Sequence, residues 1–378
     1  MTLLWRFILF LSSLKFGLFS LSCFFIIVLV GTFAQIEHGI FYTQKVYFHS
    51  LFIMIPFRDI HIPVFPGGGL VGSLMVLNIV GATCFKIQWT RKKIGLVFVH
   101  LGLIVLLLGG GLASCVSYES QVYMEEGDST YFANDLHHNE LVIIDPSFPR
   151  YDKIYAIPIK DLISGQTISD DTLPFEIHVH EQFDNVLLSL SEIPNKAISK
   201  GVGTGLTITS IPEFTQDDKK NNEGAIISIH HENKDYGRYV VALDIDGYQE
   251  IHINNTIYYI QVRPRRVYFP FMMTLKTFTQ ELYPGSNIPK AYSSLVSIRD
   301  FKMGSERDVL IYMNHPYRQD NLTFFQASFG KEEPSSILQV VRNPLWLIPY
   351  ISCIIISLGL LLHFSIYLLA FLKRRKNA

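Results

Sequence analysis

Four long apolar runs constrain the fold of this chain more than any other feature. Residues 16–34, 67–85 and 94–118, and further along 344–372, each extend for 19 residues or more without Asp, Glu, Lys or Arg. A helix of that length, rising about 1.5 Å per residue, crosses a hydrocarbon core of roughly 30 Å. Only 17% of the residues are charged, below the quarter or so that is usual for globular chains. The sequence therefore predicts an integral membrane protein with four transmembrane helices and argues against a soluble enzyme.

Basic residues flank these runs and predict how the chain is oriented. They precede the first run, fill the link between the second and third, and follow the fourth: Arg6, Lys15, Lys86, Arg91, Lys92, Lys93, Lys373, Arg374, Arg375 and Lys376. Under the positive-inside rule all three groups lie in the cytoplasm. We therefore expect residues 35–66 and 119–343 on the other side of the membrane.

The first run also bears on localisation. It is longer than the core of a signal peptide, and the segment Gly31–Gln35 is a poor A-x-A cleavage site, so we expect the run to be retained as a span. No Ser- and Arg-rich transit segment precedes it, which favours a bacterium over a thylakoid. We expect a multi-pass protein of the bacterial inner (cytoplasmic) membrane whose large domain faces the periplasm or cell exterior.

The chain divides into three predicted parts. These are a membrane domain at 1–118 with three transmembrane helices (16–34, 67–85, 94–118), an extracytoplasmic β-rich domain at 119–343, and at 344–378 a fourth transmembrane helix with a basic cytoplasmic tail. The outer segment 35–66 is rich in aromatic residues and contains three prolines, so we expect it to be irregular.

Short alternating runs replace continuous apolarity in the outer domain, and they predict about ten strands. The runs are Glu140–Asp145, Leu173–His180, Gly205–Ile211, Ala225–His230, Arg238–Ile245, Gln249–Val262, Ser294–Ile298, Asp308–Met313, Leu322–Phe329 and Ser336–Val341. Little helical periodicity accompanies them, so the fold class is membrane α plus β: four transmembrane helices with a large antiparallel sandwich or open barrel between the third and fourth.

Charge and cysteine usage exclude several functions. A net charge of −1 without a large basic face argues against nucleic-acid binding. The four cysteines all fall inside or at the edges of the apolar runs, and no C-x-x-C or C-x-x-C-H motif is present. The chain is therefore neither a thiol oxidoreductase nor itself a c-type cytochrome, and we interpret the cysteines as small apolar packing residues.

His100 is the most informative single residue, because an ionisable group inside lipid is costly and marks a site or a buried partner. It lies roughly 10 Å inside the cytoplasmic boundary by helix rise, a depth comparable to those of Asn78 and His363 in the second and fourth runs. One interpretation is structural: His100 donates to Asn78 or to a backbone carbonyl and holds two helices together. The other is functional: His100 is an axial haem ligand, with His363 or another chain supplying the second ligand and Asn78 supporting the site.

The remaining histidines carry less signal. His363 is the weaker haem-ligand candidate, and a packing or interfacial role is the favoured interpretation for it. His178 and His180 project from one face of a predicted strand and offer a possible metal pair, but no Cys or carboxylate cluster accompanies them, which favours a solvated strand face. The adjacent pairs His137-His138 and His230-His231 point to opposite faces of their strands.

Several ordered motifs resemble the ResB family of cytochrome c biogenesis proteins, over roughly residues 10–130 and 265–370. They are Ser12–Lys15, Gly31–Gln35, Gly95–Gly110 with its His-Leu-Gly core, Gln121–Asp128, Pro270-Phe271 with Leu275 and Phe278, Tyr283–Gly285, Asn314–Pro316, Phe325–Phe329 and Arg342–Pro344. Asn314-His315-Pro316 departs from the commoner Asn-Pro-Pro, and Phe324-Phe325 departs from the usual Phe-Tyr.

The resemblance implies a function in system II, the two-component machinery of haem export and cytochrome c synthesis. It implies that His100 takes part in an intramembrane site for haem b at the interface with a ResC (CcsA)-like partner, which supplies the opposite ligand. The family's tryptophan-rich segment and outer histidines belong to that partner, and the three tryptophans here are well separated. Whether this chain is itself an enzyme stays open, because the resemblance implies that the partner organises catalysis in a haem lyase (cytochrome c synthase) complex.

Two hypotheses therefore stand. In the first, the chain carries haem across the bilayer and presents it for attachment to apocytochrome c. In the second, it is a haem-free membrane-anchored assembly or chaperone scaffold that binds an apoprotein through its β domain. A transporter subunit for a small solute is disfavoured, because the runs carry few polar groups and the chain has no nucleotide-binding loop.

Overall fold

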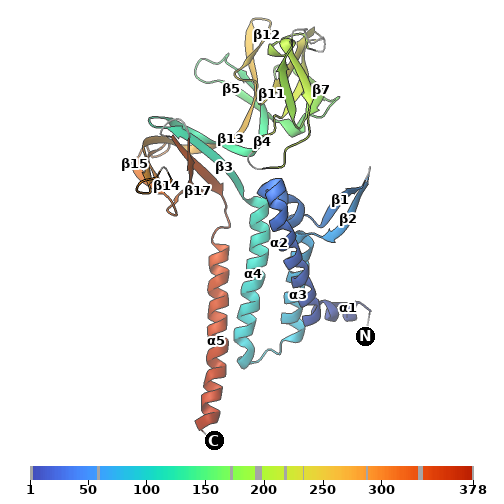
Figure 1. Ribbon diagram of the computed structural model, residues 1–378, viewed down its shortest axis with the longest axis vertical. Coiled ribbons are helices and arrows are strands. Elements are labelled where there is room, and N and C mark those ends of the chain that lie inside the picture. Colours follow the sequence, from blue (N-terminus) through green and yellow to red (C-terminus); the bar gives the residue numbers. More distant parts are fainter. Residues whose placement is uncertain are drawn as a thin grey trace. The chain divides into compact units, whose positions relative to one another are not determined.

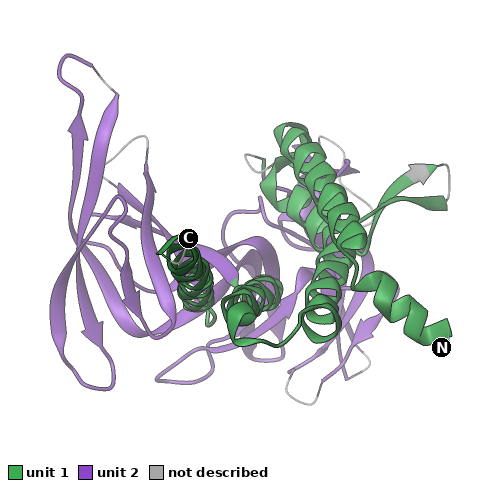
Figure 2. Cartoon of the chain, turned by 90° about the horizontal axis from the view of Figure 1, so that it is seen from below, with its two compact units in different colours: residues 1–117, 215–219, 343–378 green, residues 118–214, 220–342 purple. Residues whose placement is uncertain are grey.

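The computed structural model describes residues 3–57, 60–170, 173–191, 198–216, 219–232, 234–286, 288–330 and 335–376. The chain forms two compact units (Figure 2). Unit 1 comprises residues 1–117, 215–219 and 343–378, and unit 2 comprises residues 118–214 and 220–342.

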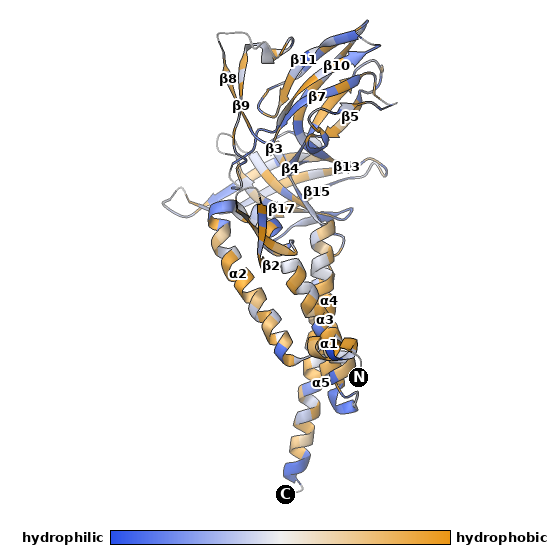
Figure 3. Cartoon of the chain, turned by 90° about the vertical axis from the view of Figure 1, so that its right-hand side faces the viewer, coloured by the Kyte–Doolittle hydropathy of each residue, from blue (hydrophilic) through white to orange (hydrophobic). Residues whose placement is uncertain are grey.

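Unit 1 is helical. Its helices are α1 (Leu3–Leu11), α2 (Leu14–Thr43), α3 (Gly68–Gly81), α4 (Ile94–Val116) and α5 (Ile348–Lys376) (Figure 1). The π-helical turns Gln44–Phe48 and Ala82–Lys86 extend α2 and α3, and a 3-10 turn, Arg91–Lys93, precedes α4. Four helical segments are long and apolar enough to cross a membrane: Leu14–Phe48, Gly68–Lys86, Arg91–Val116 and Ile348–Lys376. The prediction of four apolar helices is confirmed, and Figure 3 colours these helices mostly as hydrophobic.

The segment between the first two spans differs from the prediction. Helix α2 continues to Thr43 with a bend at Gly39, whose φ of 75° favours glycine. The remainder contains an antiparallel hairpin of β1 (Phe52–Phe57) and β2 (Ile60–Pro66). The expectation of an irregular segment was wrong, because Ile, Val and Phe favour strands and both strands of a two-stranded hairpin are edges, which tolerate proline.

Glycines spaced seven residues apart bring α4 against α5. A Cβ at Gly95 would lie 2.5 Å from the backbone nitrogen of His363, and one at Gly102 would lie 3.1 Å from the carbonyl oxygen of Ser352. Gly359 of α5 faces Gly95 in return, since its Cβ would lie 2.8 Å from the Gly95 carbonyl. Because glycine has no side chain, the two helices approach closely at these positions, as in other membrane helix pairs.

Unit 2 is built from antiparallel strands, which confirms the predicted large β domain. The strands are β3 (Tyr118–Glu125), β4 (Ser129–Asp145), β5 (Lys153–Pro158), β6 (Thr167–Ile168), β7 (Glu176–Phe183), β8 (Val186–Leu190), β9 (Leu206–Ser210), β10 (Gly224–His231), β11 (Lys234–Ala242), β12 (Gln249–Ile253), β13 (Thr256–Leu282), β14 (Pro289–Asp300), β15 (Glu306–Tyr312), β16 (Tyr317–Gln319), β17 (Leu322–Phe329) and β18 (Ser335–Arg342). The large sheet has the order β15-β14-β13-β4-β3-β18-β17-β16, with β12 beside β13 and β5 beside β4. A second sheet has the order β11-β10-β7-β6, and β8 pairs with β9.

Two separate cores lie along the long strands β4 and β13. In the first, Leu141 of β4 and Ile260 of β13 pack with residues of β7, β10 and β11, including Ile227. In the second, Ala133 of β4 and Phe271 of β13 pack with strands β3, β14, β15, β17 and β18. The two long strands therefore connect two lobes, which a single predicted sandwich or barrel does not describe.

Candidate functional site

His100 faces the end of the second span. Its Nδ1 lies 2.8 Å from Oγ1 of Thr83, which belongs to the π-helical turn after α3. The Thr83 hydroxyl donates its single hydrogen to the carbonyl of Ile79, one helical turn earlier, at 2.7 Å. The hydroxyl must therefore accept from His100, so Nδ1 carries the ring proton of the neutral imidazole. The lone pair of Nε2 is left for another partner, which is the form of histidine that binds a metal.

Thr83 does not stand out in the sequence, because the rise of an ideal helix places it at a different depth in the membrane from His100. Counting from Lys86 places Thr83 only about 5 Å inside the membrane boundary, whereas the same count places His100 at about 10 Å. A threonine hydroxyl in a helix commonly donates to the carbonyl four residues earlier. The Thr83 hydroxyl hydrogen accordingly points to the carbonyl of Ile79. A π-helical turn, which is frequent at functional sites, places that hydroxyl beside His100.

Asn78 has a different partner from the one predicted. Its Nδ2 donates to the carbonyls of Leu11 at 2.5 Å and of Ser13 at 3.0 Å, which lie at the junction of α1 and α2. Gly17 makes room for it, since a Cβ there would lie 2.7 Å from Oδ1 of Asn78. Asn78 thus satisfies the carbonyl of Leu11 at the end of α1, whereas the carbonyl of Ser13 also accepts from the Gly17 N–H in the first turn of α2. The predicted support of His100 by Asn78 is corrected to Thr83.

His363 lies on α5 beside Gly95 rather than beside His100. Its ring contacts Tyr367, with centroids 4.7 Å apart, and its Nδ1 is buried without a hydrogen-bond partner among the described residues. Gly95 and His100 are five residues apart on α4, which places them about 140° apart around the helix axis. The structure therefore puts the two histidines on different sides of α4. Within this chain His363 is not placed as the second ligand to a metal held by His100.

Three histidines of the four-stranded sheet, His178, His180 and His230, lie within hydrogen-bonding distance of hydroxyl groups. His178 lies 2.9 Å from Oγ1 of Thr167, and Nε2 of both His180 and His230 lies 3.0 Å from Oγ of Ser228. Burial, with smaller effects from nearby charges, lowers the pKa of His180. Within the described ranges, no group of three or more His, Cys, Asp or Glu side chains is arranged to hold a metal ion.

The C-terminal motifs build the second core of unit 2. Phe324 is fully buried, and Gln326 accepts a hydrogen bond from Ser294 at 2.6 Å. Asn314, with a φ of 62°, lies in the tight turn between β15 and β16, where the ring of His315 stacks on Tyr312. These contacts give the motifs structural roles.

Comparison with known proteins finds a ResB-like segment and one related protein. The family described as ResB-like matches residues 254–337, from the turn between β12 and β13 to the start of β18. The curated protein NrfI of Wolinella succinogenes is 22% identical over 298 residues, which cover 76% of this chain and 29% of that protein. The chain thus spans less than a third of the length of this relative. The predicted resemblance to the ResB family is confirmed.

A solved structure gives no further information about the fold. The crystal structure of MucB in complex with MucA(peri) aligns over 67% of this chain and 97% of that chain, with 11% sequence identity and a TM-score of 0.11. A similarity this low carries no argument.

Proposed function

We propose that this ResB-like chain is a subunit of a system II cytochrome c synthesis complex that carries haem b across the membrane and presents it for attachment to apocytochrome c. The family match and the four apolar helices support a membrane protein of cytochrome c biogenesis. The observation that carries the haem assignment is the bond between His100 and Thr83. It leaves Nε2 of an imidazole in an apolar helix free to bind iron.

The residues around His100 fit a haem ligand. Haem supplies an iron that takes an imidazole nitrogen, and its porphyrin faces are apolar. Thr83 holds the His100 ring in the required tautomer and orientation, as partners of metal-bound histidines commonly do. The apolar side chains of the spans exclude water from such a site.

The second ligand is assigned to a partner. His363 lies on a different side of α4, so we assign the second iron ligand to a ResC/CcsA-like membrane protein that would bind beside His100. We also assign the organisation of catalysis to that partner, and the docking of apocytochrome c to unit 2. The basic groups around Lys86 and at Lys373–Lys376 support placing unit 2 on the periplasmic or outer side of a bacterial inner membrane.

The test is the haem content of the complex purified after co-expression with its partner. His100→Ala should abolish the Soret absorbance per mole of complex, because the iron loses one imidazole. His252→Ala is the matched control, since it removes an exposed histidine of β12 that bonds Glu250, and it should leave the spectrum unchanged. Full haem content in His100→Ala would refute the ligand assignment.

The haem-free scaffold remains the second candidate, and the same bond supports it. A hydrogen bond between His100 and Thr83 ties α3 to α4 without any cofactor. This alternative predicts a colourless complex and full function with Asn or Gln at position 100.

A further inference from the structure

The hairpin of β1 and β2 carries exposed apolar side chains on both of its faces. Ile55 pairs with Ile62, and the neighbouring Met54 pairs with Pro63. Because side chains alternate along a strand, these two pairs lie on opposite faces of the hairpin. Ile55, Ile62 and Met54 are 51%, 43% and 42% exposed, and Pro63 is exposed as well. A sheet that packs on a protein core buries one face, and this part of the hairpin buries neither.

Only the base of the hairpin is held by the helices. Ile53 and Phe65, which pair across the strands, pack against the cluster that Ile27 of α2 and Val71 of α3 form. Figure 1 shows the strands projecting from there, away from the ends of α2 and α3. Strand β1 has six residues, which is a length of about 20 Å. The exposed part of the hairpin therefore begins at the end of two apolar spans and stays within its own short length of that end.

The sequence of the hairpin continues the composition of the spans. No Asp, Glu, Lys or Arg occurs at 46–57 or at 60–85, so the uncharged run that forms the second span reaches back through the whole of β2. The first span, Leu14–Phe48, ends in the aromatic residues Tyr47 and Phe48, and aromatic side chains are common at the membrane–water interface. The apolar surface of the hairpin is thus continuous along the chain with the surface that the spans present to lipid.

We propose that the β1–β2 hairpin is a membrane anchor that inserts both faces among the headgroups and the upper acyl chains of the bilayer. Lipid surrounds a projecting element on every side, whereas a single docking surface on a protein covers one face of a sheet. The hairpin is joined to α2 and to α3, so an anchor here restrains the depth and tilt of the first two spans.

The open edges of the hairpin set the depth of insertion. A two-stranded sheet has two edges, each with backbone N–H and C=O groups that need partners outside the sheet. Hydrocarbon offers no such partners, and open sheet edges facing lipid do not occur in the bilayer core. Water and lipid headgroups supply them at the interface. The hairpin therefore lies in the interfacial layer and does not cross the membrane.

The test places a tryptophan in the hairpin of the full chain, reconstituted in nanodiscs with and without brominated lipids. Ile55→Trp adds emission to that of the three native tryptophans, and the difference from the parent reports the new side chain. Bromine near the headgroup end of the acyl chains should quench most of the added emission, and bromine near the chain ends should quench less of it. Ile154→Trp is the matched control, because Ile154 is an exposed isoleucine of β5 in unit 2, and its added emission should not be quenched.

Two further measurements separate lipid from a protein partner. Ile62→Glu, added to Ile55→Trp, places a carboxylate directly across the strands and should remove most of the quenching, because a charge is costly among acyl chains. In the complex co-expressed with the ResC/CcsA-like partner, the quenching of Ile55→Trp should persist.

Two outcomes would overturn the proposal. One is quenching of Ile55→Trp no greater than that of Ile154→Trp. The other is quenching that disappears in the co-expressed complex, which would assign the hairpin to the partner protein. Neither readout involves haem, so the anchor and the proposed function can fail independently.

Discussion

Replacing Thr83 with valine should weaken haem binding through His100 while leaving the helices packed. Valine has nearly the shape of threonine but lacks the hydroxyl, so His100 Nδ1 loses the acceptor that lies 2.8 Å away. Leaving a buried donor without a partner costs about 1–3 kcal/mol. Loss of the hydrogen-bond partner of a metal-bound histidine typically lowers affinity 10- to 100-fold, which corresponds to about 1.4–2.8 kcal/mol.

The assay is the transfer of haem from the purified complex to an excess of apomyoglobin, followed by Soret absorbance. Thr83→Val should release haem at least tenfold faster than the parent, and Thr83→Ser should behave like the parent because the hydroxyl remains. Thr32→Val is the matched control: Thr32 also bonds the carbonyl four residues back, at 2.7 Å from Val28, but it contacts no histidine in the hydrogen bonds of the described chain. If Thr83→Val and Thr32→Val release haem at the same rate, Thr83 does not support the ligand.

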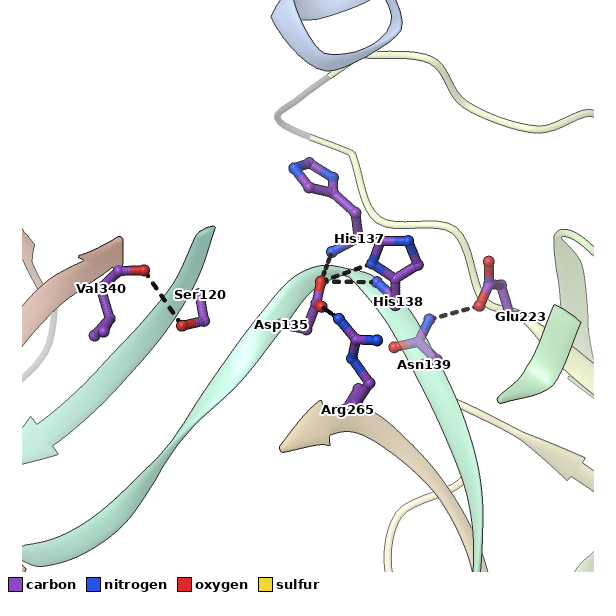
Figure 4. Close-up of polar contacts among 8 residues, drawn as sticks. All are labelled: Ser120, Asp135, His137, His138, Asn139, Glu223, Arg265 and Val340. Atoms are coloured by element: carbon purple, nitrogen blue, oxygen red, sulfur yellow. Dashed lines mark hydrogen bonds and ion pairs between the residues drawn. The ribbon is translucent and has the colours of Figure 1, made fainter. Parts of the chain in front are cut away.

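Two other predictions concern stability. Gly102→Val should separate α4 from α5 and lower the melting temperature of the detergent-solubilised protein, because the new Cβ would meet the α5 backbone. Gly110→Val is the control, since a Cβ there meets nothing within 4 Å. Equal melting temperatures of the two variants would contradict close packing of α4 against α5. Burial alone would raise the pKa of Asp135, but hydrogen bonds and the charges of His138 and Arg265 lower it from an ordinary 3.8 to about 2 (Figure 4). Asp135 should therefore contribute roughly 2 kcal/mol that is present above pH 4 and is lost as the pH falls towards 2. Chemical denaturation between pH 6 and 2 should show this loss in the parent and a smaller one in Asp135→Asn, and parallel curves would count against it.

The helices and the existence of the β domain follow from the sequence because they depend on local patterns. An uncharged run long enough to span lipid has few alternatives to a helix, and alternating polarity identifies strands such as β7 and β12. Alternation reports which face of a strand is buried but not against which sheet. The division of β4 and β13 between two cores was therefore not predictable from the pattern.

The candidate site was only partly predictable for a related reason. His100 stands out because it is a polar residue in an apolar run, whereas Thr83 is a common residue near the end of a span. His138 was set aside because adjacent residues alternate in a regular strand. A bulge at residues 135–138 of β4 breaks that alternation, and a carboxylate three residues earlier, Asp135, then reaches the His138 ring.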